Sequence, residues 1–222
     1  MKLRGFKMDK KELARLIDHT LLKSDAKIDD IKKLCDEAIK YNFYSVCINP
    51  CYIKIAKDFL ENSDIKITTV ISFPLGASSI YVKIKEAEDA ILNGADEIDM
   101  VMNIGMFKSS NYDYIYEEIS SIKKTIGKNI LKVIIETSLL NDEEKIKACK
   151  IVKKSGADFV KTSTGFSQGG ATKEDILLIR KTVGDNFGIK ASGGIKSYEQ
   201  ALELIKAGAT RIGSSSSVKI VS

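Results

Sequence analysis

The stretch SGADFVK occupies residues 155–161, and its glycine comes directly before a short apolar run. NGADEID at 93–99 and AGATRIG at 207–213 repeat this arrangement. Glycine commonly ends a helix because it accepts the left-handed backbone conformation, and the apolar residues that follow are typical of a buried strand. The three stretches therefore predict a recurring unit in which a helix ends at glycine and a strand follows.

Short apolar or β-branched runs recur along the whole chain. They are RLIDHT (15–20), FYSVCIN (43–49), KITTVIS (66–72), ADEIDMV (95–101), ILKVIIE (130–136), ADFVKT (157–162), FGIKAS (187–192) and TRIGSS (210–215). Between them, apolar residues recur with the helical period of 3.6. Examples are Ile80, Ile84, Ala87 and Ile91 after the third run, and Tyr112, Ile115, Ile119 and Ile122 after the fourth.

Eight such units in 222 residues predict an α/β protein with one domain, residues 1–222, folded as a single (β/α)8 TIM barrel. A doubly wound open sheet is the alternative fold. It is disfavoured because no GxGxxG motif follows the first strand.

Composition indicates a compact globular protein, with 44% hydrophobic residues, 29% charged residues and two prolines. The N-terminal segment MKLRGFKMDKKELARL lacks the apolar stretch of a signal peptide, and no run of apolar residues is long enough to cross a membrane. The scattered cysteines Cys35, Cys47, Cys51 and Cys149 favour reduced thiols and a cytoplasmic location. With His19 the single histidine, we expect no metal site.

The net charge of +5 suggests an anionic partner, either nucleic acid or a phosphorylated metabolite. Only four of the 35 basic residues are arginines, and many lysines stand beside acidic residues, as in KIKEAED at 83–89. This pattern is typical of solvated helix faces, so we expect no nucleic-acid surface.

Polar residues stand at the ends of the predicted strands, where barrel enzymes carry their chemistry. These residues are Asp18, His19, Thr20, Glu97, Asp99, Asn103, Glu136, Lys161 and Lys190. For any single acid, a structural ion pair that closes the barrel mouth explains the position equally well.

Two lysines that converge on one cavity are harder to explain structurally, because Lys161 and Lys190 repel each other. At a separation of about 5 Å and an effective dielectric constant near 20, this repulsion is roughly 3 kcal/mol, or about two pKa units. A lysine with its pKa lowered in this way is an amine nucleophile that can form a Schiff base with a carbonyl. The pair therefore predicts a lysine-dependent carbonyl enzyme.

Glycines and hydroxyl residues follow the last three strands. They are Gly165, Gly169 and Gly170, then Ser192, Gly193 and Gly194, then Gly213, Ser214, Ser215 and Ser216. Loops at these positions of a barrel often bind phosphate through backbone amides and a helix N-terminus. Each cluster alone could merely form a turn, but together with the lysines they predict a sugar-phosphate site.

The residues also resemble a known family, the deoxyribose-phosphate aldolases. The matching strings, in order along the chain, are DHT (18–20), TTVISFPLG (68–76), EIDMVMNIG (97–105), KVIIETSLL (132–140), FVKTSTGF (159–166), KASGGI (190–195) and RIGSSS (211–216). The resemblance implies a (β/α)8 barrel and a lyase that reversibly cleaves 2-deoxy-D-ribose 5-phosphate to D-glyceraldehyde 3-phosphate and acetaldehyde. It implies Schiff-base chemistry with no cofactor and no metal.

The resemblance also implies roles for particular residues. Lys161 would form the Schiff base, Lys190 would perturb it, and Asp99 would transfer protons through a water molecule. Residues implied to bind substrate are Asp18 and Thr20, and, at the phosphate, Gly165, Gly193, Gly194, Ser215 and Ser216. Cys47 matches a cysteine near the pocket of some members, without a catalytic role. Members are often homodimers or homotetramers.

The sequence departs from the family pattern at Ser72, Ser167, Gln168 and Ser217, and its end, SVKIVS, lacks the C-terminal tyrosine that assists proton transfer in some members. Two other functions remain open. A phosphosugar-binding sensor would need the glycines and serines but not Lys161. A phosphate-binding isomerase would need an acid and a base but not two lysines.

Overall fold

Eight parallel strands form a closed barrel in the computed structural model, which describes residues 8–222. Each strand pairs with the next along the chain, and β8 pairs with β1. The strands are β1 (Ile17–Leu21), β2 (Ser45–Ile48), β3 (Lys66–Ile71), β4 (Glu97–Val101), β5 (Ile130–Ile134), β6 (Phe159–Lys161), β7 (Gly188–Ser192) and β8 (Arg211–Ser214). Seven lie within their predicted runs, and β1 extends one residue beyond its run, to Leu21, so the (β/α)8 barrel is confirmed. Residues 1–7 of the predicted domain lie outside the described residues.

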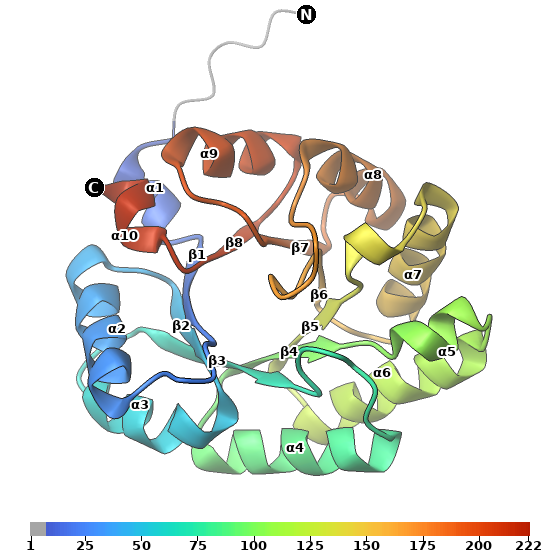
Figure 1. Cartoon of the computed structure of the whole chain (residues 1–222), viewed down its shortest axis with the longest axis horizontal. Helices are drawn as coiled ribbons and strands as arrows, with labels where there is room; N and C mark the ends of the chain where they lie inside the picture. The colour runs from blue at the N-terminus through green and yellow to red at the C-terminus, as the bar shows by residue number, and fades with distance from the viewer. Residues whose placement is uncertain (1–7) are drawn as a thin grey trace, which may run out of the picture.

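Helices surround the barrel, as Figure 1 shows. They are α1 (Lys10–Ala14), α2 (Ile28–Tyr41), α3 (Ile53–Phe59), α4 (Ile80–Asn93), α5 (Ile104–Lys108), α6 (Tyr112–Ile126), α7 (Asp142–Lys154), α8 (Lys173–Val183), α9 (Tyr198–Ala207) and α10 (Ser217–Val221), with 3₁₀ turns at Pro50–Tyr52 and Thr137–Leu139. No helix in the described part of the chain combines the length and the apolar character needed to cross a membrane.

The repeated glycines end helices as predicted. Gly94, Gly156 and Gly208 have φ angles of 109°, 83° and 119°, which lie in the left-handed region that glycine adopts without strain. In each repeat the next strand begins three residues later, at Glu97, Phe159 and Arg211. The repeated motif therefore sets the point at which β4, β6 and β8 enter the barrel.

The predicted helix faces are confirmed in α6 and only partly in α4. Ile115, Ile119 and Ile122 are fully buried in α6. In α4, Ile84 is only partly buried, whereas Lys83 is fully buried. Lys83 is accommodated because its ammonium lies 2.6 Å from the buried carboxylate of Glu118 in α6 and donates to the Val101 carbonyl oxygen at 2.7 Å. This ion pair joins two helices to the end of β4.

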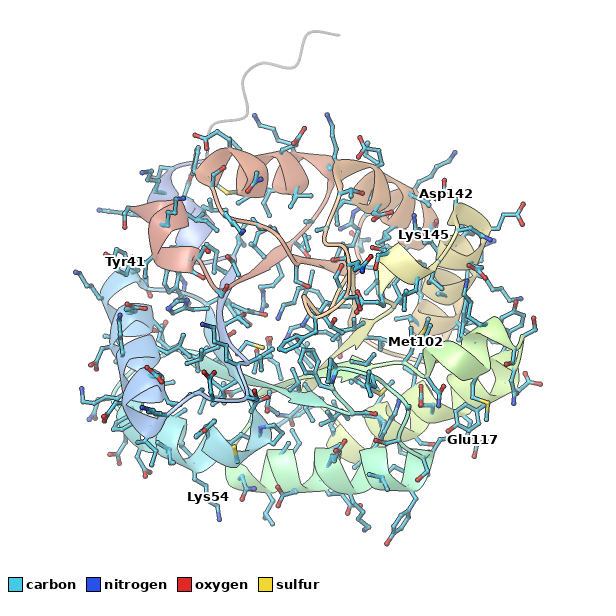
Figure 2. The ribbon with its side chains drawn as sticks, in the orientation of Figure 1. Tyr41, Lys54, Met102, Glu117, Asp142 and Lys145 are labelled. Atoms are coloured by element: carbon cyan, nitrogen blue, oxygen red, sulfur yellow. The ribbon has the colours of Figure 1, made fainter. Side chains whose placement is uncertain are left out.

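Successive side chains of each strand point alternately outward, into the apolar core between strands and helices, and inward, into the interior of the barrel. Outward-facing residues such as Ile98, Val133 and Ile212 belong to one hydrophobic cluster that includes the helix residues. Side chains fill the centre of the ring of strands, whereas the labelled Lys54 and Glu117 point away from it (Figure 2). The inward-facing rows, usually apolar in such barrels, carry charged residues here.

Candidate active site

Asp99 of β4 lies between the two lysines that the sequence singles out. Its Oδ2 accepts hydrogen bonds from Lys161 Nζ and Lys190 Nζ, each at 2.7 Å. The two ammonium nitrogens are therefore no farther apart than twice that distance. Strand register explains the meeting, because Lys161 and Lys190 are paired positions of β6 and β7. The two lysines therefore meet as predicted, but they meet at the Asp99 carboxylate, and only Lys161 also lines a cavity.

Two cations that the sequence analysis did not single out complete the buried network. Lys132 of β5 lies 2.7 Å from both Asp99 Oδ1 and Glu97 Oε2. Arg211 of β8 donates to Asp18 Oδ1 at 2.7 Å and to Glu97 Oε2 at 2.9 Å. The signal for both was a charge inside a predicted strand, but their partners depend on the register of neighbouring strands.

Lys190 also contacts Asp18, whose Oδ2 lies 2.5 Å from its ammonium. A second hydrogen bond to Asp18 comes from the Ser45 hydroxyl at 2.8 Å. Asp18 therefore holds Lys190 from the β1 side of the barrel while Asp99 holds it from the β4 side. The Asp18 side chain is fully buried and does not line the pocket at the carboxyl ends of the strands, so it cannot contact a molecule bound there directly. We therefore expect Asp18 to affect the site by holding Lys190 in place.

The four cations differ in how burial and ion pairing balance. Burial lowers the pKa of Lys161, the Asp99 carboxylate opposes this effect, and the positive charge of Lys190 lowers that pKa further. Burial acts on Lys190 in the same direction, but Asp18 and Asp99 outweigh it and raise the pKa of Lys190. The pKa values of Lys132 and Arg211 are also raised by their carboxylate partners despite burial. Of the four cations in the network, Lys161 alone has a lowered pKa, and the other three have raised pKa values.

This result corrects one expectation from the sequence. Repulsion between Lys161 and Lys190 contributes to the lowered pKa of Lys161, but burial is the larger cause. The physical reason is Asp99, whose carboxylate lies between the two ammonium groups and offsets much of their repulsion. Three carboxylates, those of Asp18, Glu97 and Asp99, face four cations in this network.

Above the network lies a pocket of about 270 Å³, at the carboxyl ends of the strands. Its lining includes Lys161 and the predicted substrate residues Thr20, Gly165, Gly193, Gly194, Ser215 and Ser216. Asp18, Asp99 and Lys190 do not line this pocket; their side chains are fully buried. The structure thus brings the predicted residues together in two layers, and Lys161 connects them.

Glycines shape the pocket wall where a side chain would obstruct it. Beyond the glycine itself and its two chain neighbours, no heavy atom lies within 4 Å of the position that a Cβ would take at Gly165 or Gly194, so both face open space. At Gly213 a Cβ would lie 2.9 Å from Lys190 Cε. The Ser216 amide donates to Ser214 Oγ at 2.9 Å, so this amide is engaged within its own loop.

Aromatic and apolar residues form another part of the site. Phe166 lines the pocket and packs edge-to-face against Phe73, with ring centroids 5.2 Å apart. Phe73 in turn packs against a buried cluster of Leu22, Cys47 and Val70. Cys47 is a free thiol, and burial raises its pKa, which opposes thiolate formation. Within residues 8–222, no group of His, Cys, Asp and Glu side chains is arranged to hold a metal ion.

Acid should destabilise the protein through this network. Burial alone would raise the pKa of Asp18 and Asp99, but the surrounding cations hold both values well below the usual range. Both carboxylates therefore contribute stability that is fully present above about pH 4, the unfolded pKa, and is lost as the pH falls toward the folded values. Each such carboxylate adds about 1.4 kcal/mol per pH unit to that loss.

Urea unfolding between pH 5 and pH 3 measures this slope. The Asp18→Asn variant lacks one of the two titrating groups, so its free energy of unfolding should fall less steeply than that of the unmodified protein. Equal slopes would show that Asp18 is not ionised against its cationic neighbours in the folded state.

Comparison with known proteins places this arrangement in a family. The model of the DeoC/LacD family aldolase matches residues 12–219. Deoxyribose-phosphate aldolase of Caldicellulosiruptor saccharolyticus is 62% identical over 218 residues, covering 97% of this chain and 99% of that protein. The enzyme of the same name from Caldanaerobacter subterraneus is 58% identical over 212 residues, covering 94% of this chain and 92% of its own length.

A solved structure agrees with these matches. The deoxyribose phosphate aldolase of unique tetrameric structure from Aeropyrum pernix superimposes with a TM-score of 0.88 at 33% identity, over 96% of this chain and 91% of that one. The family match covers nearly all of the barrel and every residue of the buried network. The chain therefore belongs to the DeoC/LacD aldolase family.

Proposed function

We propose that this chain is a deoxyribose-phosphate aldolase, a lyase that reversibly cleaves 2-deoxy-D-ribose 5-phosphate to D-glyceraldehyde 3-phosphate and acetaldehyde. The observation that carries the proposal is the position of Lys161, a lysine of lowered pKa at the boundary between a pocket and a buried network of charges. A neutral amine at this point can attack a carbonyl that enters the pocket. The relatives named above support the choice of substrate.

In this proposal Lys161 attacks the C1 carbonyl and forms a carbinolamine that loses water to give the Schiff base. The positively charged Schiff base withdraws electrons while the C3 hydroxyl gives up its proton and the bond between C2 and C3 breaks, which releases glyceraldehyde 3-phosphate and leaves an enamine. Protonation of the enamine and hydrolysis then release acetaldehyde and restore the amine. Asp99 is assigned to the proton transfers because its carboxylate is 2.7 Å from Lys161 Nζ.

Lys190 is assigned to keeping the Lys161 amine neutral, and Asp18 to holding Lys190 in place. Six predicted substrate residues line the pocket together with Lys161. The phosphate group is assigned to Gly165, Gly193, Gly194, Ser215 and Ser216, and the hydroxyl groups of the substrate are assigned to Thr20. The whole chain, residues 1–222, is proposed to act as one catalytic domain without a cofactor or a metal.

Assembly and location are also part of the proposal. A homodimer or homotetramer is proposed, and the tetrameric relative from Aeropyrum pernix supports it. A cytoplasmic location is proposed because all four cysteines are free thiols, as expected in a reducing compartment.

Borohydride reduction in the presence of acetaldehyde tests the proposed chemistry. The proposal expects a stable mass increase of one reduced ethyl group, found by peptide mapping at Lys161. A phosphosugar-binding sensor or an isomerase would gain no such adduct, because neither uses an imine. Absence of the adduct, together with absence of aldol cleavage in a coupled assay, would overturn the proposed function.

The role of Lys190 has a separate test in the pH dependence of kcat/KM. Replacing Lys190 with leucine removes a positive charge beside Lys161, so the pKa of Lys161 should rise. The acid limb of the profile should then move to higher pH. Lys145→Leu is a suitable control, since Lys145 pairs with Asp175 on the outer helices and lies away from the barrel interior. An unmoved acid limb in Lys190→Leu would contradict the assigned role.

A further inference from the structure

Glu136 follows β5 in a backbone conformation that a side chain seldom adopts. Its φ of 51° and ψ of 70° are left-handed, and the residue is only 2% exposed. The residues on either side are tied to the end of β6, because the Ile135 amide donates to the Lys161 carbonyl at 3.0 Å and the Thr137 amide to that of Thr162 at 2.9 Å. Strained residues persist where their surroundings fix them, and they cluster at functional sites.

The Glu136 carboxylate is committed to one partner in the next loop. Its Oε2 accepts from the Thr164 hydroxyl at 2.5 Å and from the Thr164 amide at 3.2 Å. A buried carboxylate needs donors to replace water, and a short contact between a hydroxyl and a carboxylate is typical of a charge-assisted hydrogen bond. Thr164 is itself buried, so this contact is shielded from solvent.

The hydrogen bonds continue through Thr164 to the pocket wall. The Phe166 amide donates to Thr164 Oγ1 at 3.1 Å, so this hydroxyl both donates and accepts. Gly165 lies between them with a φ of 82°. Thr164, Gly165 and Phe166 all line the pocket, and the connection from β6 to α8 that carries them lies over the centre of the ring of strands in the view of Figure 1.

We propose that Glu136 is a positioning residue for the phosphate end of the substrate, acting through Thr164 on the backbone of residues 164–166. The inference rests on the proposed function, because it concerns how that sugar phosphate is held. Glu136 does not line the pocket, and every described hydrogen bond that its carboxylate accepts comes from Thr164. Glu136 is therefore proposed to fix the conformation of residues 164–166 and not to transfer protons.

Glu136→Gln tests the role with the least change in shape. Glutamine keeps one acceptor oxygen but lacks the negative charge, so the charge-assisted hydrogen bond from the Thr164 hydroxyl should weaken and the loop should be held less firmly. We expect the ratio of kcat/KM for 2-deoxyribose 5-phosphate to kcat/KM for unphosphorylated 2-deoxyribose to fall by about 10- to 100-fold, mainly through KM for the phosphorylated sugar. A general loss of structure would lower both values and leave the ratio unchanged.

Thr164 provides a matched pair of variants should Glu136→Gln fail to fold. Thr164→Val removes the hydroxyl at constant shape and should lower the same ratio. Thr164→Ser keeps the hydroxyl and should retain the ratio of the unmodified protein. An unchanged ratio in both Glu136→Gln and Thr164→Val, or an equal fall for the two sugars, would overturn the proposal.

A binding measurement separates this inference from the proposed function. Inorganic phosphate should raise the melting temperature of the unmodified protein more than that of Glu136→Gln, and this readout needs no turnover. If acetaldehyde and borohydride left Lys161 unmodified while the phosphate effect still depended on Glu136, the aldolase assignment would fail and the positioning role would stand. Equal phosphate effects in both proteins would reject the positioning role alone.

Discussion

Lys161→Ala is expected to lower kcat for aldol cleavage by on the order of 10⁵-fold or more, the scale seen when an enzyme loses its covalent nucleophile. Alanine cannot form the Schiff base, and no other described lysine both lines the pocket and belongs to the buried network. The fold should survive, because the three carboxylates keep Lys132, Lys190 and Arg211 as partners.

The coupled aldol assay measures this loss, and mass spectrometry after borohydride treatment shows whether the acetaldehyde adduct disappears with it. Inorganic phosphate should still raise the melting temperature of the variant, since the glycines and serines of the pocket are intact. Lys206→Ala, a change on the outer helix α9, serves as the control and should keep its adduct. A Lys161→Ala protein with substantial cleavage would show that another group forms the imine.

Asp99→Asn is expected to lower kcat by about 10²- to 10⁴-fold, the range for loss of a general acid or base. The asparagine cannot take up and return a proton beside Lys161. It also leaves Lys132 and Lys190 without a carboxylate that each contacts at 2.7 Å. Breaking a buried ion pair in this way costs about 3–5 kcal/mol of stability, so the free energy of unfolding should fall as well.

Asp18→Asn distinguishes the loss of proton transfer from the loss of stability that are both expected for Asp99→Asn. Asp18 belongs to the same network and contacts Lys190 and Arg211, but no ion pair joins it to Lys161. Its loss should cost comparable stability in urea unfolding while retaining at least about tenfold more activity than Asp99→Asn. If both variants lost activity to the same extent, the effect of Asp99 would come from the network's stability and not from proton transfer.

Much of the barrel could be predicted from local patterns. The glycine that precedes β4, β6 and β8 must adopt a left-handed conformation, and the runs that follow are buried on both faces, so both features are visible in sequence. The residues at strand ends were also visible as charges where apolar residues would be expected. Parallel strands place such residues at one end of a barrel, which is why Lys161, Lys190 and Asp99 could be grouped in advance.

Other features depend on which residues meet across strands. In the sequence, Lys132 is a single charge within an apolar run, and its position beside Asp99 follows only from the register of β4 and β5. Lys83 occupies a position on the buried side of α4 that its charge argues against, and only the facing Glu118 makes that position possible. For the same reason, the sequence alone predicts repulsion from Lys190 as the cause of the lowered pKa of Lys161 and leaves out burial, the larger cause. Burial and the intervening carboxylate are properties of packing, which sequence spacing does not determine.

The surplus of one cation in the barrel has a consequence for the whole reaction cycle. While the Lys161 amine is uncharged, the three carboxylates of the network balance its three other cations. The iminium stage brings one uncompensated positive charge into a poorly solvated space. An unpaired charge in such an interior destabilises the iminium, so we expect it to convert readily to the uncharged enamine or back to the free aldehyde.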